Sequence, residues 1–292
     1  MSKRILKHTF SLMNVDHVYL GEKWNYINVI SPYFRLYYIN EGAGEISDVK
    51  KTLRLEPGHL YAIPSFTLCN LCCSDQLSQY FVQFFEESPD GISLFFNNRS
   101  IMKVRALDID IANFKRLLEI NPGRGINRSD NPKVYEKNIF YKEYQALNDQ
   151  QNLSVFLETQ GLLLQLISRF VASINFRPKE LLQIPTKIME AISYISLNIS
   201  NELTVKSLAD RANLNGDYFS RLFKQYTGGS PIDYIHEKRI ERAQYLIVTT
   251  RMSFTEIAQL TGFENIFYFS KLFKRITGTT PGRYKKQSEL IN

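Results

Sequence analysis

The chain has 292 residues, 44% of them apolar and 22% charged, which suits two packed domains and excludes wholesale disorder. No apolar run reaches the roughly 18 residues of a membrane-spanning helix, and residues 1–8 lack the apolar core of a signal peptide, so we expect a cytoplasmic protein. The net charge of +7 is uneven: residues 181–292 hold 15 basic and 10 acidic side chains (net +5), and residues 1–180 hold 21 and 19 (net +2). A basic C-terminal part suits a polyanionic partner, although a solvated surface explains the same excess.

Residues 9–106 are rich in aromatic and β-branched side chains between short turn signals, a pattern that favours strands. Many short strands at this spacing are typical of a β-barrel or a β-sandwich. The clearest predicted strands span 33–39, 53–55, 60–63 and 80–85.

The three cysteines, Cys69, Cys72 and Cys73, form an odd and clustered set that does not match a disulfide framework. No histidine stands in zinc-finger spacing to them. Cys72 and Cys73 are adjacent and project to opposite faces of a strand, which disfavours a shared metal. We interpret all three as packed strand residues, with a redox or metal sensor as the alternative.

After residue 106 the pattern changes to helical periodicity. Helices are predicted over 110–119, 133–147 and 153–174, and a proline-containing linker over 175–186. The apolar stripe of 153–174 is wider than one core face requires. Burial against the strands accounts for most of it, and a homodimer interface is a reasonable use of the rest.

An internal repeat dominates the C-terminal third. The segment Tyr218–Lys224 (YFSRLFK) recurs as Tyr268–Lys274 (YFSKLFK), 50 positions later, and Thr-Gly, Pro and Tyr follow each copy at matching offsets. The interval from Ala209 to Tyr218 is nine residues, whereas the interval from Ala258 to Tyr268 is ten. The second helix of the second copy should therefore start differently.

Each copy carries the signals of two short helices joined by a tight turn. Thr204 and Ser253 are predicted N-caps, and Asn213 and Gly262 are predicted to end the first helices in a left-handed conformation. The buried faces of the second helices should hold Phe219, Leu222 and Phe223 in one copy, and Phe269, Leu272 and Phe273 in the other.

Two helices joined by a short turn are typical of a helix-turn-helix unit, whose second helix fits the major groove of DNA. A helical solenoid is the alternative, but it favours about three repeats and needs no basic outer face. One continuous helix between the copies would hold two units at a fixed separation, suited to grooves about 34 Å apart. The sequence therefore predicts double-stranded DNA as a partner.

Residues 187–286 resemble the DNA-binding domain of the AraC/XylS family, through Leu208-Ala209, Tyr218–Lys224, Thr227-Gly228, Pro231, Tyr234, Arg239-Ile240, Ala243, Ile257-Ala258, Gly262-Phe263, Tyr268–Arg275, Gly278, Thr280-Pro281 and Tyr284. The strands resemble, more weakly, the cupin-like effector domain of that family, through Tyr37-Tyr38-Ile39, Gly42, Gly44, Leu55–Gly58 and Ile63-Pro64. The resemblance implies an α+β multidomain chain: a cupin-like β-barrel with trailing helices over 1–174, a linker over 175–186, and an all-α domain over 187–292. Its two helix-turn-helix units span about 204–226 and 253–276, and the linker helix spans about 231–248.

The resemblance places the base-reading positions at the exposed starts of the two second helices, at Asn215, Asp217, Ser220 and Arg221, and at Asn265, Phe267, Ser270 and Lys271. Lys224 and Lys274 are assigned to phosphates. Arg221 suits bidentate bonding to guanine, and Asp217 either accepts from cytosine or stabilises the helix N-terminus. Phe267 either contacts thymine methyl groups or packs internally, and plain solvation is the alternative for each polar residue.

By the same resemblance, a small-molecule effector, often a sugar or another metabolite, binds in the barrel of a homodimer that activates transcription with RNA polymerase. The candidate effector-binding residues are Trp24, Arg35, Tyr37 and Tyr61, with plain barrel core as the alternative. A regulator without an effector, controlled by abundance or by a protein partner, is a second possibility, and a DNA-tethered cupin metalloenzyme is a remote third. Because His59 stands alone and no nucleophile elbow or phosphate loop is visible, we expect no enzyme, no metal and no cofactor.

Overall fold

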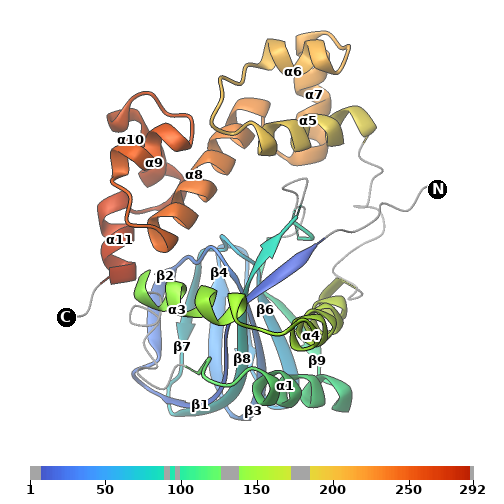
Figure 1. The fold of residues 1–292 in the computed structure, drawn as a ribbon, viewed down its shortest axis with the longest axis vertical. Helices are drawn as coiled ribbons and strands as arrows, with labels where there is room; N and C mark the ends of the chain where they lie inside the picture. Colours follow the sequence, from blue (N-terminus) through green and yellow to red (C-terminus); the bar gives the residue numbers. More distant parts are fainter. Residues whose placement is uncertain (1–7, 89–92, 96–98, 126–137, 172–184, 290–292) are drawn as a thin grey trace. The chain divides into compact units, whose positions relative to one another are not determined.

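The computed structural model describes residues 8–88, 93–95, 99–125, 138–171 and 185–289. It divides into two compact units, one made mainly of residues 8–87 and 98–175 and the other mainly of residues 176–287 (Figure 1). The N-terminal unit combines strands and helices, and the described part of the C-terminal unit is helical, which confirms the predicted change of pattern along the chain. Apart from Pro185 and Thr186, the predicted linker lies outside the described residues.

The described strands of the N-terminal unit form two antiparallel sheets. The five-stranded sheet has the order β1-β8-β3-β6-β9, and the four-stranded sheet has the order β2-β7-β4-β5. Their bounds are β1 (Thr9–Gly21), β2 (Asn25–Val29), β3 (Phe34–Gly42), β4 (Gly44–Asp48), β5 (Thr52–Leu55), β6 (His59–Ile63), β7 (Cys69–Cys72), β8 (Gln76–Glu87) and β9 (Met102–Arg105).

The two sheets face each other across a shared core instead of closing into the predicted barrel. Tyr37 and Phe81 of the larger sheet and Ile46 and Leu71 of the smaller one belong to a single buried cluster. The chain passes from one sheet to the other at Gly42, whose φ of +80° and close approach to the backbone of strand β8 leave no room for a side chain. Within the described residues, this arrangement is the sandwich and not the closed barrel.

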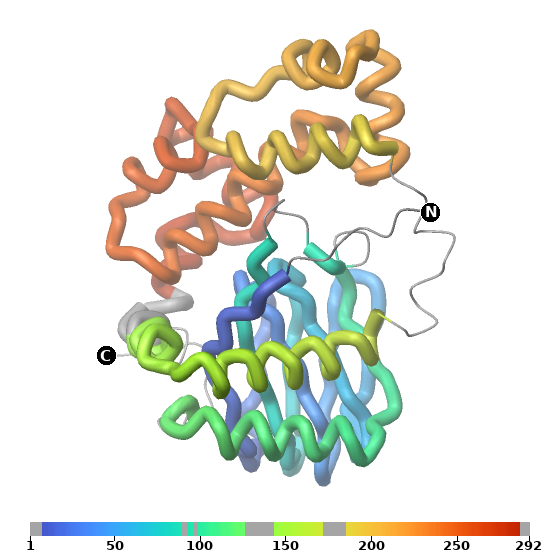
Figure 2. The backbone as a smooth tube through the Cα atoms, turned by 45° about the vertical axis from the view of Figure 1, so that its right-hand side comes forward, coloured from blue at the N-terminus to red at the C-terminus, as the bar shows by residue number. Residues whose placement is uncertain are grey.

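Three helices cover the other face of the five-stranded sheet (Figure 2). They are α1 (Asp108–Ile120), α3 (Asn138–Asp149) and α4 (Leu153–Val171). Phe114 of α1 lies with its ring centroid 6.4 Å from that of Tyr38 on β3, which shows how the helices seal the sheet. All three helices agree with prediction, although residues 133–137 and 172–174 of the predicted ranges lie outside the described residues.

The cysteines are unpaired, and two of them are core residues. Cys69 and Cys73 are buried in the cluster between the sheets, as predicted, whereas Cys72 is only half-buried. Within the described residues, no group of three or more His, Cys, Asp and Glu side chains is placed to hold a metal ion. None of the described helices is long and apolar enough to cross a membrane.

The C-terminal unit contains a first helix pair, α6 and α7, and a second helix pair, α9 and α10, with α8 between them. The bounds are α5 (Thr186–Leu197), α6 (Val205–Arg211), α7 (Gly216–Thr227), α8 (Pro231–Thr249), α9 (Phe254–Leu260), α10 (Ile266–Thr277) and α11 (Pro281–Glu289). Helix α5 was not predicted as an element. Its residues Ile188, Ile192 and Ile195 pack in one cluster with Phe219 and Phe223 of α7, so α5 completes the core around the first pair.

The predicted helix ends are confirmed by their hydrogen bonds. The hydroxyl of Thr204 accepts a bond from the backbone N–H three residues later, at 3.1 Å. Ser253 and Glu256 form a reciprocal capping box, with bonds of 3.2 and 2.7 Å. Gly228 and Gly278 end α7 and α10 with φ of 83° and 77°. Local chemistry therefore fixes the lengths of the short helices.

Candidate nucleic-acid interface

Helices α7 and α10 are anchored by the same buried aromatic face. Phe219 and Phe223 are fully buried with ring centroids 5.6 Å apart, and Phe269 and Phe273 repeat this arrangement at 5.7 Å. The predicted buried faces are confirmed, except that Leu222 is only half-buried. Because the buried face is fixed, the orientation of the opposite face is fixed as well.

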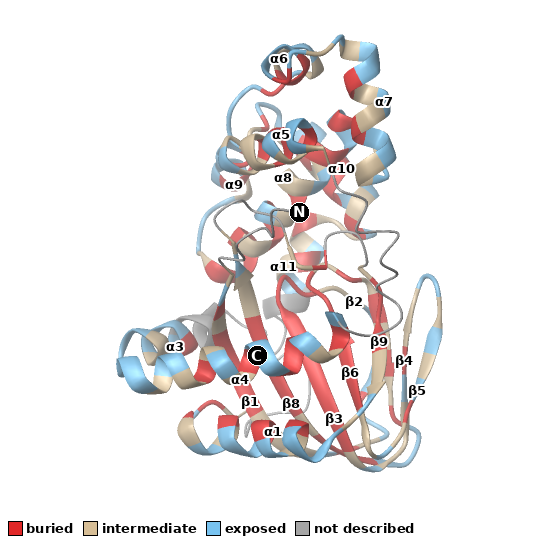
Figure 3. Ribbon diagram, turned by 90° about the vertical axis from the view of Figure 1, so that its right-hand side faces the viewer, coloured by how far each residue is buried: buried red, intermediate tan, exposed pale blue. Residues whose placement is uncertain are grey.

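The opposite face of each helix presents three exposed side chains at helical spacing. They are Asp217, Arg221 and Lys224 on α7, and Phe267, Lys271 and Lys274 on α10. Figure 3 shows buried and exposed residues alternating along the ribbon of α7. Residues four and then three positions apart lie on one side of a helix, so each set forms a single stripe. Ser220 and Ser270 are half-buried beside the stripes.

Phe267 is 82% exposed, which excludes the alternative that it packs internally. Its ring stands free on α10, two residues before the fully buried Phe269. A phenylalanine exposed to this extent is unfavourable in water, and it offers an apolar surface to a ligand.

Asn215 and Asn265 cap the N-termini of these two helices. The Asn215 Oδ1 accepts from the backbone N–H of Asp217 at 2.9 Å. The Asn265 Oδ1 accepts from the backbone N–H groups of Phe267 and Tyr268 at 2.8 and 3.0 Å. These oxygens are engaged in capping, which leaves the exposed amide NH₂ group of each side chain to donate to another molecule.

The turns inside the two pairs begin alike and end differently. Asn213 and Gly262 take left-handed conformations, with φ of 49° and 79°, as predicted. In the next residue of each turn, the backbone N–H bonds back to Ala209 or Ala258, at 3.0 and 2.8 Å. The second turn then has one more residue, Glu264, before its capping asparagine. Helix α10 therefore starts one residue later than α7, in agreement with the predicted inequality.

Helix α8 spans 19 residues and contacts α7, α9 and α10. Ile235, Ile240, Ala243, Leu246 and Ile247 are buried, as predicted for a continuous packing helix. The half-buried imidazole of His236 faces the second helix pair, and its Nε2 lies 3.4 Å from the Tyr268 hydroxyl. Burial, reinforced by the cations of two nearby arginines, lowers the pKa of His236.

In the N-terminal unit, the four candidate effector-binding residues are all buried. Tyr37 and Tyr61 are cross-strand partners on β3 and β6, and Arg35 lies two positions before Tyr37 on the same face of β3. Trp24 meets Tyr37 edge-on with centroids 6.4 Å apart. The Tyr61 hydroxyl donates to the carbonyl of Arg54 at 2.7 Å, which ties it to the backbone. The structure thus brings the four together between the two sheets.

Two buried polar residues that were not predicted, Asn14 and Gln83, lie next to Arg35. Asn14, Gln83 and Arg35 are direct register partners across β1, β8 and β3, so their side chains share one face. All three are at most 1% exposed. Within the described residues, three side-chain atoms of Asn14 and Gln83 have no hydrogen-bond partner: the Nδ2 and the Oδ1 of Asn14, and the Oε1 of Gln83. The sequence around each residue does not predict this polar row, because the strand pairing joins Asn14 to Gln83, about 70 positions later.

Comparison with known proteins finds transcriptional regulators that are similar to this chain. A family model described as a helix-turn-helix domain matches residues 208–287. The Msm operon regulatory protein of Streptococcus mutans is 24% identical over 288 residues, 94% of this chain and 93% of that protein. The arabinose operon regulatory protein of Escherichia coli is 33% identical over 108 residues, 36% of each chain. The chain therefore carries an AraC-type helix-turn-helix domain over residues 208–287, and the relatives that it resembles are AraC/XylS-type transcriptional regulators.

A solved structure extends the likeness in fold to nearly the full length of the chain. ToxT from Vibrio cholerae, in its unsaturated fatty acid bound form, matches with a TM-score of 0.53 and 13% identity, over 99% of this chain and 100% of that chain, which is a likeness of fold. In three Bacillus subtilis regulators that also match, the matched segment spans only 32%, 43% and 20% of each protein.

Two features of the C-terminal unit were not predicted from the sequence. Tyr218 and Tyr268, the first residues of the repeated motif, are about half exposed and adjoin the stripes. The Arg221 guanidinium lies 5.8 Å from the Tyr218 ring, so the aromatic ring and the cation form one surface. Arg239 of α8 makes long-range contacts that its position in the sequence does not reveal.

Proposed function

We propose that the two helix pairs are helix-turn-helix units that read two successive major grooves and recognise two dissimilar half-sites. The observation that carries this proposal is the repeated geometry of α7 and α10: the same buried phenylalanine face and the same exposed stripe, 50 positions apart. An exposed helix with a basic stripe fits the width and the charge of the major groove. The proposed domain limits are those expected from the sequence, with DNA binding in residues 187–292.

The side chains of the stripes have different roles in this proposal. Arg221 bonds the edge of a guanine bidentately, and Phe267 contacts thymine methyl groups. Lys224 and Lys274 lie one turn further along and neutralise phosphates. Lys271 occupies the position of Arg221 in the second unit, and a single ammonium group reads guanine with less geometric definition than a guanidinium.

The smaller polar residues support this reading. Asp217 lies in the first turn of α7, where its carboxylate interacts favourably with the positive end of the helix dipole. In this proposal the same carboxylate accepts a hydrogen bond from the amino group of a cytosine. Asn215 and Asn265 donate through their free amide groups, and Ser220 and Ser270 contact DNA only along the edge of each stripe.

Competitive DNA binding by Arg221→Ala tests the reading role. Loss of one good base contact costs about 1–3 kcal/mol, so we expect affinity for the preferred site to fall about 5- to 150-fold, with relaxed preference at one base position. Arg251→Ala, which removes an exposed arginine outside both stripes, is the matched control. Unchanged affinity and unchanged base preference for Arg221→Ala would remove this residue from the reading set.

We also propose that a small molecule binds between the two sheets, near Trp24, Arg35, Tyr37 and Tyr61, and modulates DNA binding. The support is the buried amide of Asn14 together with the Gln83 Oε1, because buried polar atoms without partners are rare in folded proteins. The polar row favours a ligand rich in hydrogen-bonding groups, and an apolar tail would fit the aromatic residues beside it. Two probe classes follow from similar proteins: sugars, from the arabinose operon regulator, and unsaturated fatty acids, from ToxT.

Thermal unfolding of the full-length protein against both probe classes tests the effector. A ligand that raises the unfolding midpoint and also changes DNA affinity supports it. No response across a broad metabolite panel favours the regulator without an effector. Stoichiometric bound metal would instead support the third possibility, a DNA-tethered metalloenzyme.

The remaining parts of the proposal concern assembly. Helix α4 leaves Leu153, Leu157 and Leu164 exposed at heptad-like spacing on the side opposite its buried residues, which suits a homodimer contact. A dimer bound beside a promoter would act in the cytoplasm as an activator by contacting RNA polymerase. Leu157→Glu should dissociate the dimer in sedimentation equilibrium, and an unchanged mass would exclude α4 from the interface.

A further inference from the structure

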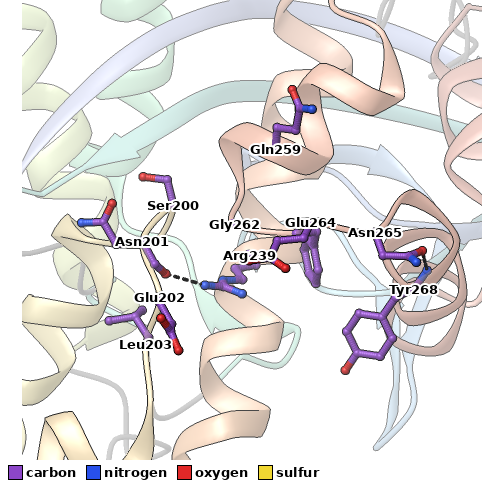
Figure 4. A pocket seen from close by; sticks show the side chains of 11 residues that line it. Ser200, Asn201, Glu202, Leu203, Arg239, Gln259, Gly262, Glu264, Asn265 and Tyr268 are labelled. Carbon is purple, nitrogen blue, oxygen red and sulfur yellow. Dashed lines mark hydrogen bonds between the residues drawn. The ribbon is translucent and has the colours of Figure 1, made fainter.

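Arg239 joins three segments of the C-terminal unit that are far apart in the sequence. It lies on α8, and its guanidinium donates to two backbone carbonyls of the segment between α5 and α6: from Nε to Ile199 at 3.0 Å and from Nη2 to Asn201 at 2.7 Å. The same group lies 5.6 Å from the ring centroid of Phe263, in the turn of the second pair. Figure 4 shows Arg239 between these two segments.

The turn of the second pair is shaped to admit this guanidinium. A Cβ atom on Gly262 would lie 2.7 Å from the Arg239 Cζ and 2.8 Å from the Ile199 carbonyl oxygen. The matching residue of the first pair is Asn213, which has the same left-handed backbone and carries a side chain exposed to solvent. The backbone conformation alone therefore does not require glycine at position 262, whereas the close approach of Arg239 and of the Ile199 carbonyl does.

The contacts of Arg239 connect the two halves of the DNA-binding unit. The segment at Ile199 packs on the core around the first pair, and Phe263 packs against Phe269 of the second pair with centroids 5.4 Å apart. Beside these contacts is a pocket of about 680 Å³, lined by Glu202, Gln259 and Tyr268 among others. The guanidinium of Arg239 is half-buried, and this burial lowers its pKa, so it is a polar link across the junction that water only partly reaches.

We infer that Arg239 is a positioning residue that sets the distance and angle between the two reading helices, and thereby the half-site spacing that the protein accepts. This inference rests on the proposed function, in which α7 and α10 read separate halves of one site. A planar guanidinium that bridges two carbonyls holds its partners in one geometry, whereas a lysine or a glutamine cannot span both. Without the bridge, the second pair is free to rotate about α8, and sites with altered spacing become acceptable.

The test measures binding of full-length protein to the duplex that the wild-type chain selects from a randomised library. Two further duplexes carry one base pair more or one fewer between the halves, which turns one half by about 35°. The readout is the ratio of affinities for the selected and altered spacings. We expect Arg239→Gln and Arg239→Lys to lower this ratio by at least about fivefold. Arg242→Gln, which changes an exposed arginine on the same helix, should leave it unchanged.

Gly262→Ala provides a second, independent perturbation, because it displaces the guanidinium while Arg239 remains. Its control is Asn213→Ala, which places alanine in the same left-handed conformation where no guanidinium approaches. We expect only Gly262→Ala to lower the ratio. Thermal unfolding identifies any variant that fails to fold. If an Arg239 variant or Gly262→Ala fails to fold, the affinity ratio of the remaining variants tests the positioning role.

The outcomes separate the two proposals. If the Arg239 and Gly262 variants lose affinity equally for all three spacings, the positioning role is wrong although two-unit reading stands. If the wild-type protein itself is indifferent to spacing, the reading by two units is wrong.

Discussion

The substitution Phe267→Ala should weaken DNA binding without changing the stability of the fold. The ring is 82% exposed, so its removal should change the free energy of unfolding by less than about 0.5 kcal/mol. Phe269, two residues later, is fully buried, and Phe269→Ala should cost about 3–5 kcal/mol. Equilibrium urea unfolding of both variants measures this contrast.

The same substitution should weaken DNA binding although the fold is intact. Full burial of a phenylalanine side chain is worth about 1.5–3 kcal/mol, which sets the loss of affinity at up to about 10- to 150-fold. The assay compares the selected duplex with duplexes in which single thymines are replaced by deoxyuridine, which lacks only the methyl group. At the contacted position, wild-type protein should lose affinity on replacement, and Phe267→Ala should bind both duplexes equally.

Two results would refute this reasoning. Equal affinity of Phe267→Ala and wild-type protein for the selected duplex would show that the exposed ring does not touch DNA. A large loss of stability in Phe267→Ala would show that the ring is buried by a contact within the protein.

Further predictions concern charge, capping and pH. Lys224→Ala should weaken binding to all sequences alike and reduce the salt dependence of log K by about one unit of slope, whereas Arg221→Ala should change base preference. Ser253→Ala removes the cap of α9 and should cost about 1 kcal/mol in urea unfolding; no change would contradict the capping box. Burial and the Arg239 cation lower the pKa of His236, so its contribution to stability is complete above the unfolded value of about 6.5 and is lost as pH falls below it. His236→Gln should therefore show a smaller loss of stability than wild-type protein between about pH 7.5 and pH 5.5, and equal losses would contradict this.

The features that sequence predicted best are those set by local chemistry. The capping box of Ser253 and Glu256 lies within four residues, and the left-handed turn at Gly262 follows from the residue type. The repeat then made each copy a check on the other, so the buried face at Phe219 and its counterpart at Phe269 follow from the sequence alone.

The features that sequence missed depend on contacts between distant segments. The sheets separate at Gly42 because of a close approach to β8, more than 30 positions away. The polar row joins Asn14 to Gln83, and Arg239 bonds to a carbonyl 40 positions earlier. Helix α5 follows a proline-containing stretch of weak periodicity, and its role became visible only in its packing on α7. Periodicity reports which face of an element is buried and does not report its partner.

The exposure of Phe267 is a further feature that the sequence left open. Position 267 lies about 200° of helical rotation from Phe269 and thus on the opposite face, but a residue in the first turn of a helix can still be covered by a neighbouring segment, so its aromatic ring is compatible with both burial and display. The extra residue Glu264 in the preceding turn shifts the start of α10, and only the folded chain shows which side of the helix the ring then takes.

The most direct test of the central claim is the sequence of the site that the full-length protein selects from randomised DNA. Two unequal reading helices, with Arg221 in one and Phe267 and Lys271 in the other, predict two dissimilar half-sites about one helical turn apart, in a fixed order. A dimer would then bind two copies of that asymmetric sequence. Selection of only one short palindrome would contradict the account.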